Sequence, residues 1–280
     1  MAARPQLDIS SVSEFFWLAR ERYQMKLRRD AGEPRPWTEN PVLRAYRFCN
    51  VFREDDRTTV WFREKVRSQI VDPYKLFQAT VGFRWFNRIE TGEKILDVLL
   101  SSGWNNQAVR ARLKDVQPLV TGAFMVKTPP AMNKLEGILW CMNYVGGDTY
   151  HHVATARTLR EAHAALMQVP YLGPFMAYEV VTDLRHTCLL ATAHDIMEWC
   201  SLGPGATRGL QWLTGQEFSR ASQQELMLGV CQELLEQAGG ASNWPKNWPK
   251  WEMREVEHWL CEYDKWKRGK AGQRLKRRYE

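Results

Sequence analysis

The stretch "LMQVPYLGPFMAYEVVTDLR", Leu166 to Arg185, decides the fold class, because it predicts two helices joined by a tight turn. An apolar helix is expected to end at Val169–Pro170, the chain turns through Gly173, and a second helix begins at Pro174. The turn and the helix N-terminus of such a hairpin present backbone N–H groups that suit a DNA phosphate. We therefore expect a helix-hairpin-helix in which Gly173 and Pro174 contact DNA.

Tyr171 leaves a second interpretation of this hairpin open. It stands where the usual hairpin has its first glycine, and a side chain at that position puts the normal turn geometry in doubt. Two helices that pack together without binding DNA, a plain αα-hairpin, fit the same pattern.

The rest of the chain also favours helices, and the predicted fold class is mainly α. Asn40 is suited to cap a short helix that has Pro41 at its first position, and Ser13 is a possible N-cap of an earlier helix. One weak strand candidate is "VTGAFMVK", residues 120–127. Helical periodicity is expected in residues 11–32, 72–100, 129–145, 158–169, 222–240 and 251–268. The helix in 222–240 is expected to end at Gly239–Gly240.

The last of these helices has an aromatic face. Trp259, Tyr263 and Trp266 follow one another at intervals of about one turn, so we expect this face to pack on the core. The loop before it, "NWPKNWPK" (243–250), repeats a four-residue unit twice, which is too few for a repeat protein.

Composition and cysteine spacing favour a cytoplasmic protein with reduced thiols. The chain has 280 residues, and no two of its six cysteines have the two-residue spacing of a zinc or redox pair. No secretory signal and no apolar run of membrane-spanning length is present, so no membrane partner is expected. The 13 tryptophans supply core packing and surfaces on which bases can stack.

The positive charge is concentrated at the C-terminus. The net charge is +7, and residues 265–280 hold eight Lys or Arg and one acid, so the rest of the chain is balanced. A basic tail at 269–280 is typical of contact with a polyanion, although a solvated helix end fits as well. The expected DNA contacts are Lys267, Arg268, Lys276 and Arg277.

The most polar aromatic stretch is "RPWTENPVLRAYRFCNVFREDDRTT", Arg35 to Thr59. If its second half were helical, one face would carry three guanidiniums and an amide beside an apolar face. Such a face predicts a phosphate clamp, and a salt-bridged helix surface is the alternative. The residues of the clamp would be Arg47, Asn50, Arg53 and Arg57. Asp55 and Asp56 are suited to hold an arginine or to ligate Mg²⁺ as a cofactor.

These segments together resemble a known family. "PWTENPVLRAYRFCNVFREDDR", "GAFMVK", "YLGPFMAYEVVTDLR", "DIMEWCSLGPGATRGL" and "EHWLCEYDKW" are similar to the α-glutamyl/putrescinyl-thymine pyrophosphorylases. These are bacteriophage DNA amino-acid or polyamine transferases, related to helix-hairpin-helix DNA glycosylases and to the 5-hydroxymethyluracil DNA kinase helical domain. The resemblance covers roughly residues 12–268.

The resemblance implies a glycosylase-like helical domain over residues 1–268 with two lobes, about 1–120 and 121–268, and a DNA cleft between them. Asp195 follows the hairpin as the catalytic aspartate of the glycosylases does, and His194 beside it is a candidate for proton transfer. A lone histidine is more often structural. The lysine of bifunctional glycosylases is replaced by Phe175, and the four-cysteine iron–sulfur motif is absent.

The resemblance also implies a reaction. A separate kinase pyrophosphorylates 5-hydroxymethyluracil in double-stranded DNA, and the transferase then displaces pyrophosphate with the amine of a free amino acid or polyamine. The clamp would hold the pyrophosphate, and Asp195 would act as general base or stabilise a cationic methylene. Trp37 and Tyr46 would stack on a flipped base. The chain has no G-x-x-x-x-G-K-[ST] loop, so it is not expected to be the kinase.

Two other functions fit the same residues. A monofunctional N-glycosylase would use the hairpin and Asp195 but has no need of an arginine cluster. A non-catalytic DNA-binding helical module that assists a 5-hydroxymethyluracil DNA kinase would use the hairpin and the basic tail. The resemblance places the protein in the cytoplasm of a phage-infected bacterium and leaves the amine unidentified.

Overall fold

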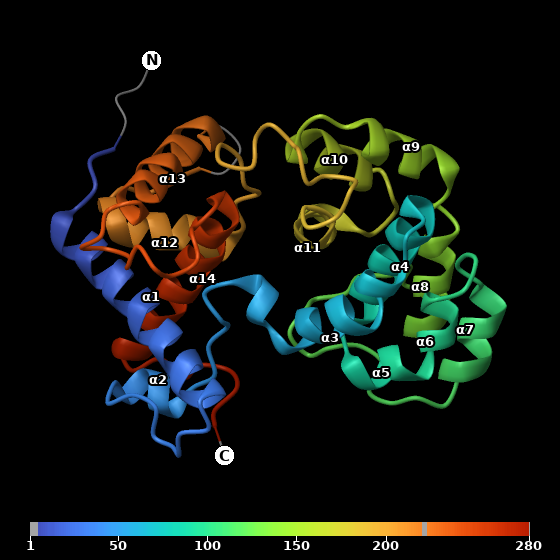
Figure 1. Cartoon of the computed structure of the whole chain (residues 1–280), viewed down its shortest axis with the longest axis horizontal. Coiled ribbons are helices and arrows are strands. Elements are labelled where there is room, and N and C mark those ends of the chain that lie inside the picture. Colours follow the sequence, from blue (N-terminus) through green and yellow to red (C-terminus); the bar gives the residue numbers. More distant parts are fainter. Residues whose placement is uncertain (1–4, 220–222, 280) are drawn as a thin grey trace. The chain divides into compact units, whose positions relative to one another are not determined.

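The structure, a computed structural model, describes residues 5–219 and 223–279 and is built of helices (Figure 1). Within those ranges no β-strand forms, so the predicted mainly α class is confirmed and the strand candidate at 120–127 is wrong. The helices are α1 (Ile9–Asp30), α2 (Pro41–Ala45), η1 (Arg53–Asp55), α3 (Arg57–Lys65), η2 (Arg67–Gln69), α4 (Pro73–Phe86), α5 (Ile89–Lys94), α6 (Leu96–Leu99), α7 (Asn106–Leu113), α8 (Lys134–Met142), α9 (Gly147–Thr155), α10 (Leu159–Leu166), α11 (Gly173–Leu184), α12 (Pro204–Thr214), α13 (Gln224–Ala238) and α14 (Met253–Lys270).

The chain divides into two compact units. Unit 1 combines the chain up to Asp56 with the chain from Ile196 onward, and unit 2 is Arg57–Asp195. This division differs from the expected lobes about 1–120 and 121–268. The reason is that α14, near the C-terminus, packs against α1, α2 and α12, which brings both ends of the chain into one unit.

Unit 1 has α14 at its centre. Trp259 and Tyr263 are fully buried and Trp266 is 3% exposed, so the predicted aromatic face does pack on the core. Helix α12 lies directly against α14, because Gly209 has no side chain to separate them. A Cβ atom on Gly209 would lie 2.4 Å from the backbone oxygen of Leu260.

The helix boundaries in unit 1 follow local capping chemistry. Asn40 accepts hydrogen bonds from the backbone of Val42 and Leu43 and caps α2, as predicted. The cap of α1 is Asp8, which accepts from the Ser11 N–H at 2.8 Å. The prediction of Ser13 as N-cap is wrong, because Ser13 lies one turn inside the helix and bonds to the Ile9 carbonyl.

The stretch after α2 is not the helix that the clamp prediction assumed. Residues 46–52, called here the extended segment, form no helix and have extended backbone at Tyr46 and at Phe52. The chain then makes the short turn η1 and becomes helical again only at Arg57. The C-terminal segment holds it in this form. The Arg47 N–H donates to the Arg277 carbonyl, and the Tyr279 N–H donates to the Ala45 carbonyl.

The basic tail expected at 269–280 follows the end of α14 and pairs with the segment after α2. Helix α14 continues to Lys270, and the chain then returns so that Arg278 forms an isolated antiparallel bridge with Tyr46. The basic segment is part of unit 1, because its backbone groups pair with residues 45–47.

Unit 2 is organised around α4, which is almost completely buried. Arg84 on α4 makes a fully buried, two-point ion pair with Asp183 on α11, in which Nη2 lies 2.6 Å from Oδ1. The same guanidinium donates to Asn87 and Thr59, so each of its three nitrogens has a hydrogen-bond acceptor. This network fixes α11 against α4.

Two helices joined by a tight turn are present where the sequence predicted a hairpin. The first, α10, ends at Leu166, earlier than expected, and α11 begins at Gly173. Tyr171 has φ 63° and Gly173 has φ 64°, so the tyrosine itself adopts the left-handed conformation that glycine usually provides. No helix in the described part of the chain is long and apolar enough to cross a membrane.

Candidate functional site

A buried polar cluster in unit 1 surrounds Asn50. The Asn50 amide oxygen accepts from Arg22 Nη2 at 2.7 Å, and its Nδ2 donates to the Asp55 carbonyl at 2.7 Å. The Asn50 backbone N–H donates to Asp56 Oδ1 at 3.1 Å. His258 Nε2 lies 3.2 Å from the Asn50 carbonyl oxygen. Asn50 therefore organises the cluster, and its predicted contact with a phosphate stays a prediction.

The arginines of the predicted clamp do not share one helical face. Arg53 is buried beside Asp56, whereas Arg47 and Arg57 are exposed. Arg57 belongs to unit 2, and Arg47 lies in the extended segment of unit 1 with its guanidinium 5.6 Å from the Tyr279 ring. The helical register assumed for the clamp is wrong, because residues 46–52 form no helix and the backbone of Arg47 pairs with the C-terminal segment.

Arg22 of α1 is a member of the cluster that the sequence did not reveal. It is 5% exposed and donates to both the Phe48 carbonyl and the Asn50 side chain. Arg22 lies at helical spacing from Leu18, Ala19 and Met25, which are also buried, so it belongs to the inner side of α1. A charged residue among buried positions of an amphipathic helix is the signal that would have marked it.

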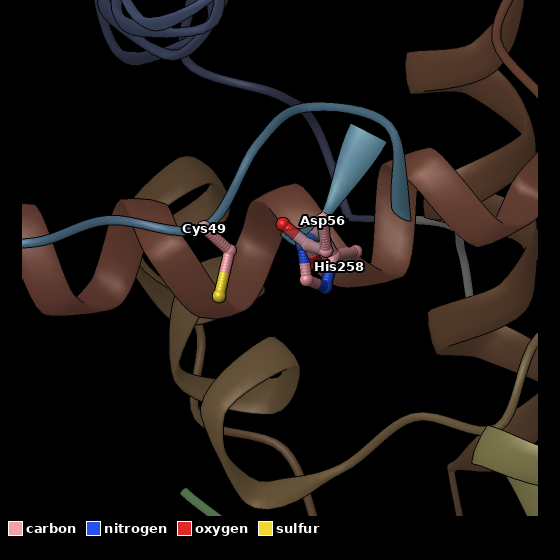
Figure 2. Close-up of side chains that lie close together, drawn as sticks. All are labelled: Cys49, Asp56 and His258. Atoms are coloured by element: carbon pink, nitrogen blue, oxygen red, sulfur yellow. The ribbon is translucent and has the colours of Figure 1, made fainter. Parts of the chain in front are cut away.

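The two aspartates of the predicted Mg²⁺ site have different partners. Asp55 pairs with Lys26 at 3.3 Å. Asp56 instead lies beside Cys49 and His258, and the ligand atoms of these three residues all lie within 4.8 Å of one another (Figure 2). Cys49, Asp56 and His258 are the one group of three potential metal ligands found among the described residues. Asp55 is not part of this group.

The surroundings shift the pKa of each of the three groups toward its neutral form. Burial, together with Arg254 and Arg53, holds the pKa of His258 well below its usual value, so the imidazole is neutral at neutral pH. Burial raises the pKa of Asp56, against the opposing effect of Arg53 and the Asn50 N–H. Burial and the carboxylates of Glu262 and Asp56 raise the pKa of the Cys49 thiol well above its usual value.

The two predicted stacking residues, Trp37 and Tyr46, lie under arginines of the same unit. Arg35 lies 4.9 Å from the Trp37 ring centre, and Arg278 lies 5.5 Å from that of Tyr46. The Trp37 indole N–H donates to the Glu33 carbonyl. Their contact with a flipped base stays a prediction, and it would have to replace or share these cation–π contacts.

Asp195 and His194 lie at the C-terminal end of unit 2. Asp195 is buried, and its two oxygens accept the backbone N–H groups of Leu159 at 2.6 Å and Arg160 at 3.0 Å. The carboxylate thus accepts two further N–H groups at the N-terminus of α10, beside the capping box of Thr158 and Glu161. His194 is exposed, and its backbone N–H donates to the Arg157 carbonyl. The structure gives Asp195 a rigid position, and its predicted catalytic role stays a prediction.

The predicted DNA contacts fall on both units. In unit 2, Gly173 and Pro174 open α11, where Tyr171 and Phe175 are 43% and 51% exposed. In unit 1, Lys267 pairs with Glu14 and Arg268 pairs with the buried Asp264. Lys276 and Arg277 are exposed in the docked C-terminal segment. Lys276 and Arg277 are therefore better placed to contact phosphates than Lys267 and Arg268, which already have acidic partners.

Comparison with known proteins gives two matches. The profile of the family described as "5-hmdU DNA kinase, helical domain" matches residues 10–275. The chain is also 26% identical over 267 residues to a 5-hmdU DNA kinase of Bacillus phage SP10, and the match covers 84% of this chain and 41% of that protein. The chain thus spans about two fifths of the length of this relative. No solved structure matches.

Proposed function

The chain belongs to the family of 5-hmdU DNA kinase helical domains, and from this premise we propose that it acts in thymine hypermodification of phage DNA. The proposed reaction transfers an amine onto pyrophosphorylated 5-hydroxymethyluracil in double-stranded DNA. The amine nitrogen forms a bond to the methylene carbon, the bond from that carbon to the pyrophosphate oxygen breaks, and pyrophosphate and a proton leave.

The observation that carries this proposal is the concentration of fixed positive charge around a buried polar cluster. Arg22 and Arg53 are buried at Asn50 and Asp56, and Arg53 and Arg254 are close enough to lower the pKa of His258. A departing pyrophosphate develops several negative charges, and preorganised cations stabilise it without reorganising during the reaction.

The exposed arginines supply the contacts that the buried ones do not. Arg47 and Arg57 can reach phosphate groups, because neither guanidinium is buried. In unit 2 the hairpin at Gly173 offers backbone N–H groups to a DNA strand. For Asp195 of unit 2, which two backbone N–H groups hold in place, we propose the role of general base, with stabilisation of a cationic methylene as the alternative.

The test is an assay in which modified nucleosides are weighed. Duplex DNA that carries pyrophosphorylated 5-hydroxymethyluracil is incubated with the whole protein and a pool of amino acids and polyamines, then digested and analysed by mass spectrometry. A nucleoside that has gained one amine and lost pyrophosphate supports the transferase and identifies the donor. An unchanged nucleoside with DNA still bound contradicts it, and loss of the base indicates a glycosylase.

Two arginine variants make the assay specific. Arg47→Ala removes an exposed guanidinium of the proposed clamp, whereas Arg44→Ala removes one on α2 that pairs with Glu39 on the surface. The expected result is a fall in rate of about 10–100-fold for Arg47→Ala, since a lost charge contact costs ~1.4–2.7 kcal/mol, and little change for Arg44→Ala. Equal rates in the two variants would remove Arg47 from the site.

A second function, assistance to a separate kinase, is favoured by the matched relative, which is a 5-hmdU DNA kinase longer than this chain. In that case the protein would bind and present DNA without changing it. With DNA that carries unphosphorylated 5-hydroxymethyluracil, a kinase and ATP would then form the phosphorylated nucleoside, this protein would raise its yield, and Asp195→Asn would leave that yield unchanged.

A further inference from the structure

We propose that Cys49, Asp56 and His258 form a zinc site with an open fourth position. The three residues belong to unit 1 and come from two elements, the extended segment with its η1 turn and helix α14. Figure 2 shows the three side chains gathered on one side of α14, with Cys49 and Asp56 on the segment that crosses the helix. This proposal does not rest on the proposed transferase function.

The distances suit a tetrahedral ion. The sulfur, the imidazole nitrogen and the carboxylate oxygen lie within 4.8 Å of one another. Bonds of about 2.0 Å to nitrogen and oxygen and about 2.3 Å to sulfur would bring these atoms to roughly 3.3–3.8 Å from one another. The required movement is about 1 Å, which rotation of the side chains can provide, since all three residues are half-buried.

The imidazole already has the outer contact that zinc-binding histidines make. His258 Nε2 lies 3.2 Å from the Asn50 carbonyl, which can only accept a hydrogen bond. Nε2 therefore carries the proton, and the lone pair is on Nδ1. Metal-bound histidines typically donate their second ring N–H to a backbone carbonyl or carboxylate in this way.

Asp56 and Cys49 are oriented by the same framework. Asp56 uses Oδ1 to accept the Asn50 N–H, which leaves Oδ2 for a metal ion. The backbone N–H of Cys49 donates to Glu262 Oε2 at 3.1 Å, and this bond fixes the cysteine above α14. All three ligands are thus positioned through Asn50 or through α14 before any ion binds, so little order has to be created on binding.

The charges of the site also fit a divalent ion. A thiolate, a carboxylate and a neutral imidazole neutralise Zn²⁺, so the nearby cations Arg22, Arg53, Arg254 and Lys265 face a site with no net charge. The donor set of sulfur, nitrogen and oxygen favours zinc over Mg²⁺ or Ca²⁺, which take oxygen ligands. Three protein ligands leave a position that water or a substrate oxygen can occupy.

A cysteine–histidine nucleophile is the other chemistry that these residues suggest, and the surroundings do not favour it. A nucleophilic pair needs a thiolate beside an imidazolium, but the pKa of Cys49 is raised and that of His258 is lowered. Both shifts favour the neutral groups. A bound cation reverses the preference at the thiol, because it stabilises the thiolate directly.

The test measures metal binding by the whole protein without DNA. Protein stripped by a chelator is titrated with Zn²⁺ against a chromophoric competitor, and with Co²⁺ as a spectroscopic substitute. The expected results are one Zn²⁺ per chain and, with Co²⁺, a thiolate-to-metal charge-transfer band with the intense visible bands of tetrahedral coordination. Absence of stoichiometric binding, or a Co²⁺ spectrum without the thiolate band, would overturn the proposal.

Variants connect the ion to these residues. Cys49→Ser and His258→Gln are each expected to weaken Zn²⁺ binding by more than the ~10–100-fold that loss of an outer-shell partner costs. Cys188→Ser, which removes an exposed thiol of unit 2, is the matched control and should bind Zn²⁺ as the unaltered protein does. Circular dichroism checks that each variant is folded. Unchanged affinity in a folded Cys49→Ser protein would also overturn the proposal.

The outcome is independent of the transferase assay. Zinc binding without amine transfer would support the metal site and contradict the proposed reaction. Amine transfer by protein that binds no zinc would do the reverse.

Discussion

Tyr171 shows how much the conformation of one residue matters in the hairpin. Its φ of 63° lies in a region where a Cβ atom is strained, and its ring, 43% exposed, packs near Trp140. The turn therefore keeps a glycine-like backbone although a large side chain is present. The aromatic ring at the tip of the hairpin is retained at the cost of local strain.

A pair of substitutions separates the strain from the ring contact. Tyr171→Ala loses the ring and keeps the strained backbone, whereas Tyr171→Gly loses the ring and relieves the strain. We expect the glycine variant to be about 1 kcal/mol more stable than the alanine variant, as measured by denaturant unfolding. Equal stabilities would mean that the turn rearranges when the ring is removed.

Glu255 gives unit 1 a pH-dependent stability. It is buried at the start of α14, where it accepts the Glu252 N–H at 2.9 Å, and burial raises its pKa to about 7. An acid with a raised pKa in the folded state binds its proton more tightly there than in the unfolded chain. This contribution to stability is complete below about pH 4.5 and is lost as the pH rises to about 7.

The prediction is that Glu255→Gln removes this pH dependence. The free energy of unfolding of the unaltered protein should fall by roughly 1–3 kcal/mol between pH 5 and pH 8, and the glutamine variant should lack that part of the fall. Glu236→Gln, an exposed site on α13, is the control and should keep the slope. Thermal unfolding midpoints across this pH range provide the measurement.

At the scale of elements, the contact between α12 and α14 depends on Gly209. A methyl group there would meet the Leu260 backbone oxygen at 2.4 Å, and a backbone atom cannot move without moving the helix. Gly209→Ala is expected to destabilise unit 1 by about 1–3 kcal/mol, even though alanine is the better helix former. Gly147→Ala on α9, where a methyl group would have no atom within 4 Å, should be neutral or slightly stabilising. Denaturant unfolding of both variants tests the difference.

The N-terminus of α10 depends on Asp195. Removal of this carboxylate by Asp195→Ala leaves the buried N–H of Leu159 without its acceptor, so a loss of about 1–3 kcal/mol is expected. Asp195→Asn keeps one acceptor oxygen and should lose less. If Asp195→Asn is stable but abolishes amine transfer, the carboxylate has a chemical role beyond the cap. If both variants have unaltered stability, the cap is not important.

At the scale of the whole molecule, the docked C-terminal segment gives unit 1 a basic surface. Arg274 and Lys276 are exposed there, while the backbone around them is held by pairing with residues 45–47. Basic side chains on a fixed backbone can contact DNA phosphates with little loss of chain entropy.

Salt dependence tests this surface. The double variant Arg274→Ala and Lys276→Ala should lower the slope of log affinity against log salt by up to ~2, since each phosphate contact contributes ~0.9. The control replaces Lys246 and Lys250, two exposed lysines in the loop before α14 of the same unit. An equal effect in both double variants would indicate general charge attraction and no specific DNA contact by the segment.

The sequence alone determined the helical class, the α2 start at Asn40–Pro41, the end of α13 before Gly239 and the buried aromatic face of α14. These features depend on capping groups and periodicity within a few residues of one another, so a local pattern contains all the information. The resemblance found in these segments is consistent with the family to which the chain belongs.

Only the tertiary structure decided the form of residues 46–56 and therefore the site. Their pattern fits a helix, but residues 45–47 pair with the C-terminal segment, Arg53–Asp55 form the short turn η1, and His258 comes from 208 residues beyond Asn50. The free energy of that long-range pairing and of burying Asn50 with Arg22 exceeds the small local preference for a helix. Propensities of a few tenths of a kcal/mol per residue cannot predict contacts between such distant segments.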